Sequence, residues 1–328
     1  MKFLLDVAVA FGLLKVFAKV TAGQCRSNKC MVGKTAIVTG GSSGIGYETA
    51  ADLASRGCKV IIADKADRAV SREALIERTG NPEVIYKHIN LASFKSVREF
   101  AKEIIKTEKR LDLLINNAGI SGIRNKLTED GQLKVMQVNH LGPFLLTHLL
   151  ADLIIRTPMS RIVFVSSILS FTNNLKKADM LNIPLNTTLD SMYAWKEYSN
   201  SKLCAMMAAN VFSEKLQEGG VMVNSAIPGL VFSSNDPILN MPNNSPLNFI
   251  INKLLYLKIV LYGKNVYEGS QTVLYCALEN DLNQVSGKVF ADCMSVMQPP
   301  LAQIWDFRSR IWNKSEELVK LTESEKLK

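Results

Sequence analysis

Residues 34–46 read KTAIVTGGSSGIG, and this stretch determines which fold the chain can adopt. Residues 34–39 form a short apolar run with the length of a buried strand, and a helix is expected from about 45 to 55. A glycine-rich turn separates the two elements, so the chain must reverse direction within a few residues. A strand, a glycine turn and a helix in this order are typical of α/β proteins that bind nucleotides.

The glycines of this turn have different expected tasks. Gly40 allows a tight turn, Gly44 lets a phosphate approach the backbone, and Gly46 lets the helix pack closely on the strand. The helix N-terminus would add free N–H groups and the positive end of its dipole. We therefore expect the pyrophosphate of a dinucleotide to bind here; a plain tight turn is the alternative.

Further apolar strands alternate with helical segments along the chain. The expected strands are 59–63, 84–89, 111–116, 161–166, 221–226 and 287–291, and the expected helices are 94–107, 131–155 and 199–217. This alternation predicts an α/β fold, a doubly wound parallel sheet with helices on both faces. Residues 168–197 and 230–265 lack the sheet pattern and are expected as insertions or lids, and the helical tail from Trp305 is expected on the solvated surface.

The composition excludes several classes of protein. Apolar residues make up 47% of the 328 residues and charged residues 21%, which is typical of a globular chain and not of a disordered or fibrous one. The net charge of +9 suits an anionic cofactor or a lipid surface, but the cations form no dense stripe, so no nucleic-acid partner is expected. With six Cys, no Cys-x-x-Cys pair and three His, we expect mostly buried free thiols and no metal site.

Residues 3–20, FLLDVAVAFGLLKVFAKV, form an apolar segment at the amino terminus. Its longest uninterrupted apolar run is Val7 to Leu14, whereas a spanning helix needs roughly 20 apolar residues. Cationic residues follow at Arg26 and Lys29, where they could face anionic headgroups. We expect residues 1–30 to contain an N-terminal hydrophobic helix that anchors the chain to a membrane; a cleaved signal and an ordinary packed helix are the alternatives.

The second strand ends in Ala63-Asp64-Lys65. A carboxylate here, 18 residues past Gly46, can accept hydrogen bonds from both ribose hydroxyls and would repel a 2′-phosphate. Asp64 therefore favours NAD(H), whereas Lys65 could partly neutralise a 2′-phosphate and leaves NADP(H) open. A solvated acid at a strand end is the alternative for Asp64.

Tyr198 and Lys202 lie four residues apart in an expected helix, so both side chains share one face and can point into one cleft. A phenol has a pKa of about 10 and is a poor base at neutral pH, but a nearby ammonium stabilises the phenolate. Tyr198 could then take the proton of an alcohol while hydride leaves for a nicotinamide, or return it in the reverse direction. Ser167, at the end of the fifth strand, could hold the substrate oxygen, and Asn139 could hold a water that links Lys202 to solvent.

In this order the motifs make the chain resemble the short-chain dehydrogenase/reductase family over residues 34 to about 293. The matching pieces are Thr39-Gly-x-x-x-Gly-Ile-Gly46, Asn116-Asn-Ala-Gly119, Asn139, Ser166-Ser167, Tyr198-x-x-x-Lys202 and Pro228-Gly229. Within the family the chain is most similar to the microsomal retinol dehydrogenase branch, through Cys25-Arg-Ser-Asn28, Val138-Asn-His-Leu-Gly142, Glu268-Gly-Ser-Gln-Thr272 and Asp292-Cys293. The resemblance implies a Rossmann-like domain over residues 31–298, followed by a helical tail over residues 299–328.

The resemblance also implies a role for each matched residue. Tyr198 would be the acid/base, Lys202 its electrostatic partner and a ribose ligand, Ser167 the ligand of the carbonyl or hydroxyl, and Asn139 the proton-relay residue. The expected cofactor-binding residues are Gly40, Ser42, Ser43, Gly44, Ile45, Gly46, Asp64, Lys65, Asn90, Leu91, Asn117, Ala118, Gly119, Tyr198, Lys202, Pro228, Gly229, Val231 and Ser233.

Three positions depart from the pattern of the retinol branch. Asp64-Lys65 stands where that branch usually has Cys-Arg, whose Arg favours NADP(H). Ile227 replaces a His that is often found before Pro-Gly. The stretch between Ser167 and Tyr198 is unusually long. We expect NAD(H) as the cofactor, with NADP(H) as the alternative. These departures concern the cofactor and the substrate and leave the hydride chemistry in place.

The expected substrate is a lipophilic alcohol or its carbonyl, retinol-like, because apolar side chains are frequent in 168–171 and 230–255. Residues 247–262 could cap the pocket, touch a membrane or pack on the core. The alternatives are a steroid or other lipid substrate, and a catalytically silent dinucleotide-binding protein. Membrane association at the endoplasmic reticulum is expected, and the resemblance also implies a homodimer.

Overall fold

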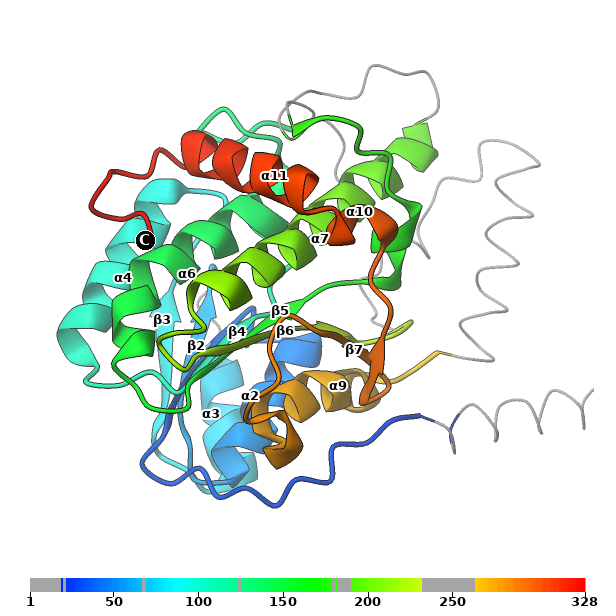
Figure 1. Ribbon diagram of the computed structural model, residues 1–328. Helices are drawn as coiled ribbons and strands as arrows, with labels where there is room; N and C mark the ends of the chain where they lie inside the picture. Colours follow the sequence, from blue (N-terminus) through cyan, green and yellow to red (C-terminus); the bar gives the residue numbers. More distant parts are fainter. Residues whose placement is uncertain are drawn as a thin grey trace, which may run out of the picture.

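A mostly parallel sheet of eight strands forms the centre of the molecule (Figure 1). The computed structural model describes residues 19, 22–66, 69–122, 126–178, 181, 190–231 and 263–327. The strands are arranged in the order β3-β2-β1-β4-β5-β6-β7-β8, and only the last pair, β7 with β8, is antiparallel. The strand order reverses between β1 and β4, which creates the crevice where ligands bind in doubly wound folds.

The elements alternate between strand and helix as far as β7. The strands are β1 (Thr35–Thr39), β2 (Lys59–Asp64), β3 (Val84–His88), β4 (Leu113–Asn116), β5 (Arg161–Val165), β6 (Met222–Ile227), β7 (Val289–Ala291) and β8 (Met294–Val296). The α-helices are α2 (Gly44–Ser55), α3 (Ala69–Thr79), α4 (Phe94–Thr107), α5 (Lys134–Met136), α6 (Gly142–Ile155), α7 (Asp190–Lys215), α9 (Val266–Leu278), α10 (Pro300–Gln303) and α11 (Trp305–Leu318). Short helical turns of other types are η1 (Gln137–Leu141), η2 (Ile168–Thr172) and η4 (Asn280–Leu282).

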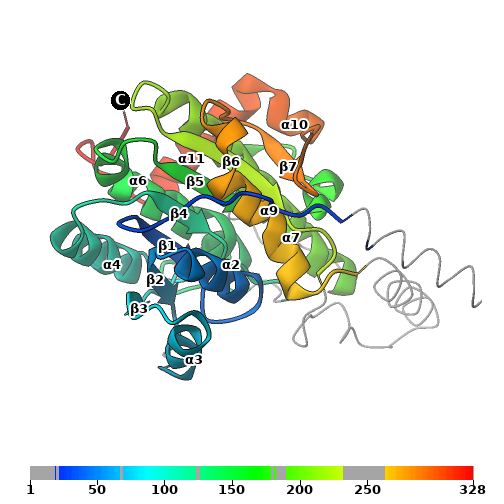
Figure 2. The ribbon, with the colours of Figure 1, turned by 90° about the horizontal axis from the view of Figure 1, so that it is seen from below.

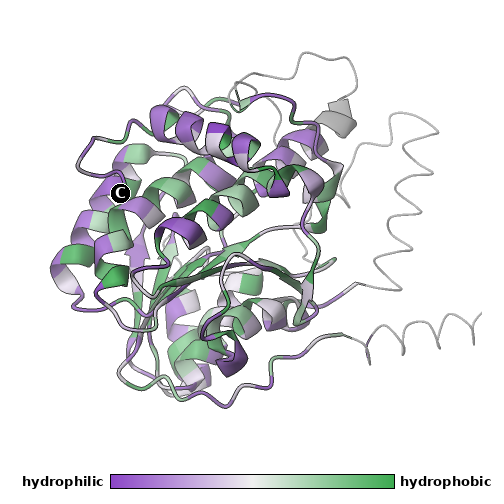
Figure 3. Ribbon diagram, in the orientation of Figure 1, coloured by the Kyte–Doolittle hydropathy of each residue, from purple (hydrophilic) through white to green (hydrophobic). Residues whose placement is uncertain are grey.

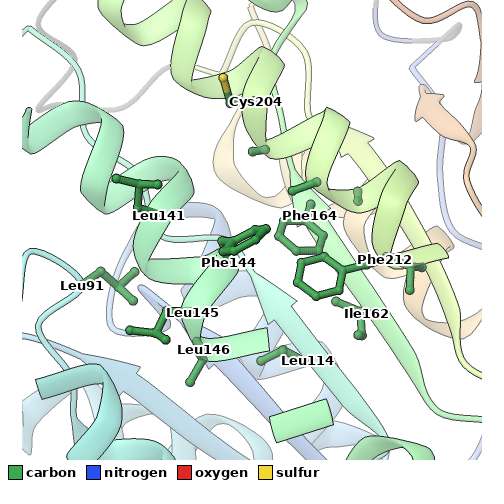
Figure 4. Packing of buried hydrophobic residues seen from close by; sticks show 14 of the residues in the cluster. Leu91, Leu114, Leu141, Phe144, Leu145, Leu146, Ile162, Phe164, Cys204 and Phe212 are labelled. Carbon is green, nitrogen blue, oxygen red and sulfur yellow. The ribbon is translucent and has the colours of Figure 1, made fainter. Parts of the chain in front are cut away.

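Helices cover both faces of the sheet, as expected. Helices α2, α3 and α9 lie on one face, and α4, α6 and α7 lie on the other (Figures 1 and 2). The strands β1, β4 and β5 are completely buried, which fits their apolar sequences. Hydrophobic residues concentrate in the strands and on the inner sides of the helices (Figure 3). Figure 4 shows Phe144, Phe164 and Phe212 gathered between α6, β5 and α7.

Most of the expected elements are confirmed, and the differences have local causes. The helix 94–107 is found at the expected residues, where Ser93 caps it by accepting a hydrogen bond from the Ser96 N–H. Helices α3, α9 and α10 and the short strand β8 were not predicted. Helix α7 begins at Asp190 and not near residue 199, so its first turns lie in the stretch 168–197 that was expected to be an insertion. Helix α9 has a clear signal in hindsight, because Asn265 and Glu268 form a capping box at its start.

The expected helix 131–155 is divided into three parts, α5, η1 and α6. The middle part, η1, is a π-helix, which is rare and is often found at functional sites. Among the described residues, Lys134–Ile155 is the one helical stretch long and apolar enough to cross a membrane. However, 83% of that window is buried inside the molecule, as in the core helix of a globular domain. The apolar segment 3–20 lies outside the described residues except for Lys19.

The carboxyl-terminal helix α11 belongs to the core, so the expectation of a solvated tail was wrong. It lies on the outer side of α6 and α7 and forms a further layer (Figure 1). The Trp312 ring packs against Phe144 and Phe212, with 4.8 Å between ring centroids in both pairs. Ser315 forms a buried hydrogen bond of 2.7 Å with Nε2 of His140. Phe307, Ile311 and Trp312 recur at helical spacing and form the buried side of α11. The charged residues that suggested a surface helix occupy the other side.

The described part of the amino-terminal segment packs along α9. The Ser27 hydroxyl donates a hydrogen bond of 3.2 Å to the Leu278 carbonyl, and the Cys25 N–H donates one of 3.2 Å to the Gln271 side chain. Arg56 donates a hydrogen bond of 2.6 Å to the Ser27 carbonyl. Residues 22–30 are therefore in contact with the domain that follows them.

Replacing Trp312 by Ala tests whether α11 is part of the core. We expect a loss of about 3–5 kcal/mol in the free energy of unfolding, because a large buried ring is removed between α6, α7 and α11. Urea unfolding followed by circular dichroism measures it. The matched control is Trp305→Ala in the same helix, whose side chain is 65% exposed, and which should change stability by less than about 0.5 kcal/mol. Equal losses in the two variants would contradict the assignment of α11 to the core.

Candidate functional site

The glycine turn between β1 and α2 has the expected geometry. Gly40 and Gly44 adopt left-handed backbone angles, with φ of +66° and +58°. A Cβ atom on Gly46 would lie 2.3 Å from the Gly40 carbonyl oxygen, so only glycine allows this close packing. A Cβ on Gly44 would meet nothing within 4 Å, so its backbone borders open space. The turn can therefore receive a phosphate at Gly44 while Gly46 fixes the helix to the strand.

The amino terminus of α2 is suited to bind an anion. Ser43, the N-cap residue, has an extended backbone, and within the described structure its side chain makes no capping hydrogen bond. The first turn also holds no acidic residue. The first N–H groups of α2 and the positive end of its dipole thus point toward the site, and among the described residues no side chain of this helix turn accepts a hydrogen bond from these N–H groups. Ile45, expected at the cofactor, and Val231 both lie beside Gly269, since a Cβ atom on Gly269 would contact the side chains of Ile45 and Val231.

The loop after β4 is fastened to the end of β1. The Thr39 hydroxyl accepts hydrogen bonds from the N–H groups of Asn117 and Ala118, at 2.9 and 3.0 Å. The Asn117 amide in turn donates one of 2.8 Å to the Thr39 carbonyl. A Cβ on Gly119 would lie 3.1 Å from Lys202 Nζ and 3.4 Å from Asn139 Oδ1. This loop therefore connects the phosphate turn with the residues expected to be catalytic.

Lys202 is a buried cation held at the carboxyl end of β5. Only 4% of the residue is exposed, and its ammonium donates a hydrogen bond of 2.8 Å to the Val165 carbonyl. Burial lowers the pKa of Lys202 to about 8. The ammonium lies 5.7 Å from the centroid of the Tyr198 ring, one turn earlier on α7. The structure therefore brings the expected pair together, with the phenol half-buried.

Ser167 lies two residues after the end of β5 and caps the turn η2. Its hydroxyl accepts a hydrogen bond of 3.2 Å from the Leu169 N–H, and the residue is half-buried. Its neighbour Ser166 is buried and donates a hydrogen bond of 2.9 Å to the Lys202 carbonyl. Ser166 thus binds α7 to β5, a structural role that the sequence analysis did not assign. Ser167 and Lys202 are held at the same strand end.

Asn139 lies in the π-helix η1, and its side-chain amide makes three hydrogen bonds to protein groups, which use both hydrogens of Nδ2 and one of the two lone pairs of Oδ1. Its Oδ1 accepts a hydrogen bond of 2.8 Å from the Ile120 N–H. Its Nδ2 donates hydrogen bonds of 2.9 Å to the Ile120 carbonyl and to the Ser201 hydroxyl. Ser201 donates in turn to the Tyr198 carbonyl, at 2.7 Å. Asn139 therefore connects η1, the loop after β4 and α7; the contact through Ser201 was not anticipated.

Asp64 lies at the carboxyl end of β2, next to the phosphate turn. Its Oδ2 accepts hydrogen bonds from the hydroxyl and the N–H of Ser42, at 2.5 and 3.4 Å. Its Oδ1 accepts one of 2.8 Å from the N–H of Lys65, whose side chain is exposed. The carboxylate is therefore oriented toward the phosphate turn, beside which a dinucleotide ribose would lie.

The remaining expected cofactor residues lie at the same edge of the sheet. Asn90 accepts a local hydrogen bond of 3.1 Å from the Ala92 N–H, and Leu91 is only 5% exposed and belongs to the core. Pro228 and Gly229 directly follow β6, and Gly229 has a φ of +92°. Ser233 lies outside the described residues. Among the residues that the structure describes, no group of His, Cys, Asp or Glu is placed to hold a metal ion.

The chain matches the model of the short chain dehydrogenase family over residues 34–179. It is 34% identical to retinol dehydrogenase 13 of Mus musculus over 326 residues, which cover 98% of this chain and 95% of that protein. It is 35% identical to mouse retinol dehydrogenase 11 over 327 residues, with 97% and 98% covered. Human retinol dehydrogenase 12 is 35% identical over 315 residues, with 95% and 93% covered.

Solved structures have the same fold. An uncharacterized protein from Mycobacterium paratuberculosis superposes with a TM-score of 0.69 at 26% identity, covering 91% of this chain and 98% of that one. A short chain dehydrogenase from Shigella flexneri complexed with NADP gives a TM-score of 0.60 at 21% identity, with 80% and 98% covered. Together with the glycine turn and the Tyr198–Lys202 pair, the sequence identities show that this chain belongs to the short-chain dehydrogenase/reductase family, in its retinol dehydrogenase branch, and is an NAD(P)-dependent oxidoreductase.

Proposed function

We propose that the protein interconverts a lipophilic alcohol, retinol-like, and its carbonyl, with Tyr198 as the acid/base. The observation that carries this proposal is the buried ammonium of Lys202, 5.7 Å from the Tyr198 ring and bound to the end of β5. A positive charge at this distance, on a buried side chain, favours the phenolate over the neutral phenol. It gives Tyr198 the means to accept a proton near neutral pH.

The two directions of the reaction use the same residues. In oxidation, the Tyr198 oxygen takes the proton of the substrate hydroxyl; in reduction, it returns that proton to the carbonyl oxygen. Ser167 holds the substrate oxygen by a hydrogen bond, and Asn139 holds the water that connects Lys202 to solvent. NAD(P) supplies the hydride acceptor or donor when it is bound. The open backbone at Gly44 and the uncapped start of α2 fit its pyrophosphate.

The apolar residues beside Ser167 support a lipophilic substrate. Ile168 and Phe171 in η2 are 56% and 41% exposed, although both are large and hydrophobic. Apolar side chains exposed next to a catalytic group are typical of a binding surface for an apolar ligand. The names of the retinol dehydrogenase relatives favour a retinoid over a steroid.

We further propose that the apolar segment 3–20 attaches the enzyme to a membrane, that of the endoplasmic reticulum, from which a lipophilic substrate would enter. A homodimer stays a prediction. Helix α11 already covers part of the outer surface of α6 and α7, so that part of these helices is not free to meet a second copy.

The cofactor we propose is NAD(H), because the Asp64 carboxylate is directed toward the phosphate turn by Ser42. In this position it can accept hydrogen bonds from ribose hydroxyls, and it would repel a 2′-phosphate. The exposed Lys65 is the group that would favour NADP(H) instead.

Replacing Tyr198 by Phe tests the mechanism. We expect kcat/KM with retinol and retinal to fall by about 100-fold or more, since the proton donor and acceptor is lost, while the affinity for reduced cofactor is largely kept. Turnover assays and cofactor fluorescence measure the two quantities. The control is Tyr275→Phe on α9, a tyrosine that packs against Phe290. Wild-type rates in Tyr198→Phe would refute the mechanism, and cofactor binding without turnover on retinoids, steroids or other lipid carbonyls would support a silent binding protein.

Replacing Asp64 by Ala tests the cofactor preference. We expect NAD(H) to bind about tenfold more weakly and NADP(H) more tightly, because one bidentate acceptor and one repulsive charge disappear together. Titration with both reduced cofactors gives the ratio of dissociation constants. The control Lys65→Ala should weaken the binding of NADP(H) and leave the binding of NAD(H) unchanged. An unchanged ratio in Asp64→Ala would show that this carboxylate does not select the cofactor.

The pKa of Lys202 predicts a pH-dependent stability of the protein without cofactor. Burial lowers this pKa from 10.5 to about 8 in the folded state, so between these values the unfolded chain binds more protons than the folded one. The free energy of unfolding should therefore rise with pH across this window, by an amount on the order of 3 kcal/mol. Below pH 8 the contribution of Lys202 is constant.

The measurement is urea unfolding of wild type and Lys202→Met from pH 7 to 10. The other groups that titrate are common to both proteins, so the difference between the two curves isolates Lys202. We expect the wild type to gain stability relative to the variant as the pH rises. Parallel curves would mean that the Lys202 ammonium is not buried as described.

A further inference from the structure

The loop that follows β6 is joined to Lys264, which lies two residues before the start of α9. The Lys264 N–H donates a hydrogen bond of 2.8 Å to the Leu230 carbonyl. Val231 and Lys264 also form an isolated parallel bridge. Residues 228–231 and Lys264 therefore form one unit at the carboxyl edge of the sheet, beside the place expected for the nicotinamide.

The side chain of Lys264 runs over Gly229. A Cβ atom on Gly229 would lie 3.3 Å from Cδ, Cε and Nζ of Lys264, and the glycine has a φ of +92°. The ammonium of Lys264 forms an ion pair of 2.5 Å with Oδ1 of Asp292, and its side chain is only 11% exposed. The position of the Lys264 stem thus limits where the backbone of residues 228–231 can move.

Asp292 is placed by a strained hairpin turn. The turn Asp292-Cys293 joins β7 to β8, and both residues have left-handed backbones, with φ of +49° and +58°. Two-residue hairpin turns of this kind normally read Asn-Gly, Asp-Gly or Gly-Gly, so Asp292 is a usual first residue and Cys293 is the exception. A Cys in this conformation is unfavourable, and such strain is often kept where it positions a functional group.

The same carboxylate oxygen also binds the amino-terminal segment. The Gly23 N–H donates a hydrogen bond of 3.1 Å to Asp292 Oδ1. A Cβ on Gly23 would lie 2.1 Å from the carbonyl carbon of Asp292, so the two backbones are in close contact. Lys19 forms a further ion pair of 2.5 Å with Glu268, the capping residue of α9. The segment is thus bound at two charged points around Lys264.

We propose that Lys264 and Asp292 are positioning residues that hold the Pro228–Val231 loop against the cofactor, and that docking of Gly23 on Asp292 couples the amino-terminal segment to this loop. The inference rests on the proposed function, because it takes this loop to border the nicotinamide. Neither residue transfers a proton or hydride. Their ion pair is partly exposed and contributes little to global stability, so its main effect is to fix the loop.

The test compares Lys264→Met, Lys264→Arg and Asp292→Asn in the full-length protein. We expect Lys264→Met and Asp292→Asn to weaken the binding of reduced cofactor about tenfold and to raise its KM similarly, with a much smaller change in kcat. Lys264→Arg keeps the charge and should restore most of the affinity. The melting temperatures should stay close to that of the wild type. The matched control is Lys59→Met, which removes a comparable ion pair with Glu108 at the opposite end of the sheet.

Wild-type cofactor affinity and KM in Lys264→Met would overturn the proposal. Fluorescence titration of the cofactor needs no substrate, so this result can be told apart from a failure of the proposed function, which would appear as full activity in Tyr198→Phe. Equal losses in Lys264→Met and Lys59→Met would also overturn it, because they would indicate general destabilisation.

Coupling to the amino-terminal segment is tested by Gly23→Ala, which places a methyl group against the Asp292 backbone. We expect it to raise the KM for the cofactor in the same direction as Asp292→Asn. In the double variant the two effects should not add, since both act through one carboxylate. A Gly23→Ala protein with wild-type KM, or full additivity, would overturn the coupling.

Discussion

The burial of the Lys202 ammonium is the constraint on which the arrangement of the site depends. A buried charge is unfavourable unless protein groups replace its hydration. In this structure the Val165 carbonyl accepts from it, the Tyr198 ring lies nearby, and Gly119 leaves the space that its terminal atom needs. Because burial disfavours the charged form, the same feature lowers the pKa of Lys202 to about 8. With this pKa the group is still mostly an ammonium at neutral pH, beside the Tyr198 ring.

This constraint explains why several distant segments meet at one edge of the sheet. Helix α7 must pack on β5 so that Lys202 lies at the carboxyl end of the strand. The hydrogen bond from the Ser166 hydroxyl to the Lys202 carbonyl holds the helix in this position. Asn139 then connects α7 to the loop after β4 through Ser201 and Ile120. The Thr39 hydroxyl joins that loop to the phosphate turn. The phosphate turn and helix α7, which carries the proposed acid/base pair, are thus held in register by short polar contacts between strand ends, where the parallel sheet places them together.

The two ends of the chain stabilise opposite sides of this arrangement. Helix α11 packs Trp312 against α6 and α7. Helix α7 carries Tyr198 and Lys202, the proposed catalytic pair. The amino-terminal residues instead run along α9 and reach the hairpin turn at Asp292. The charged sequence of α11 concealed its role, because alternation of charged and apolar residues in a helix does not show whether its apolar side has a neighbour.

The sequence by itself determined the strand–turn–helix unit, most of the parallel strands and the residue types of the site. These features depend on local physics: apolar periodicity, the backbone freedom of glycine and the spacing of Tyr198 and Lys202 on one helix face. Only the tertiary structure decided how deeply Lys202 is buried, which groups bind Asn139 and Asp64, where α11 packs, and that Lys264 and Asp292 meet beside Gly229. These facts depend on contacts between residues far apart in the chain, and such contacts leave no periodic signal in the sequence.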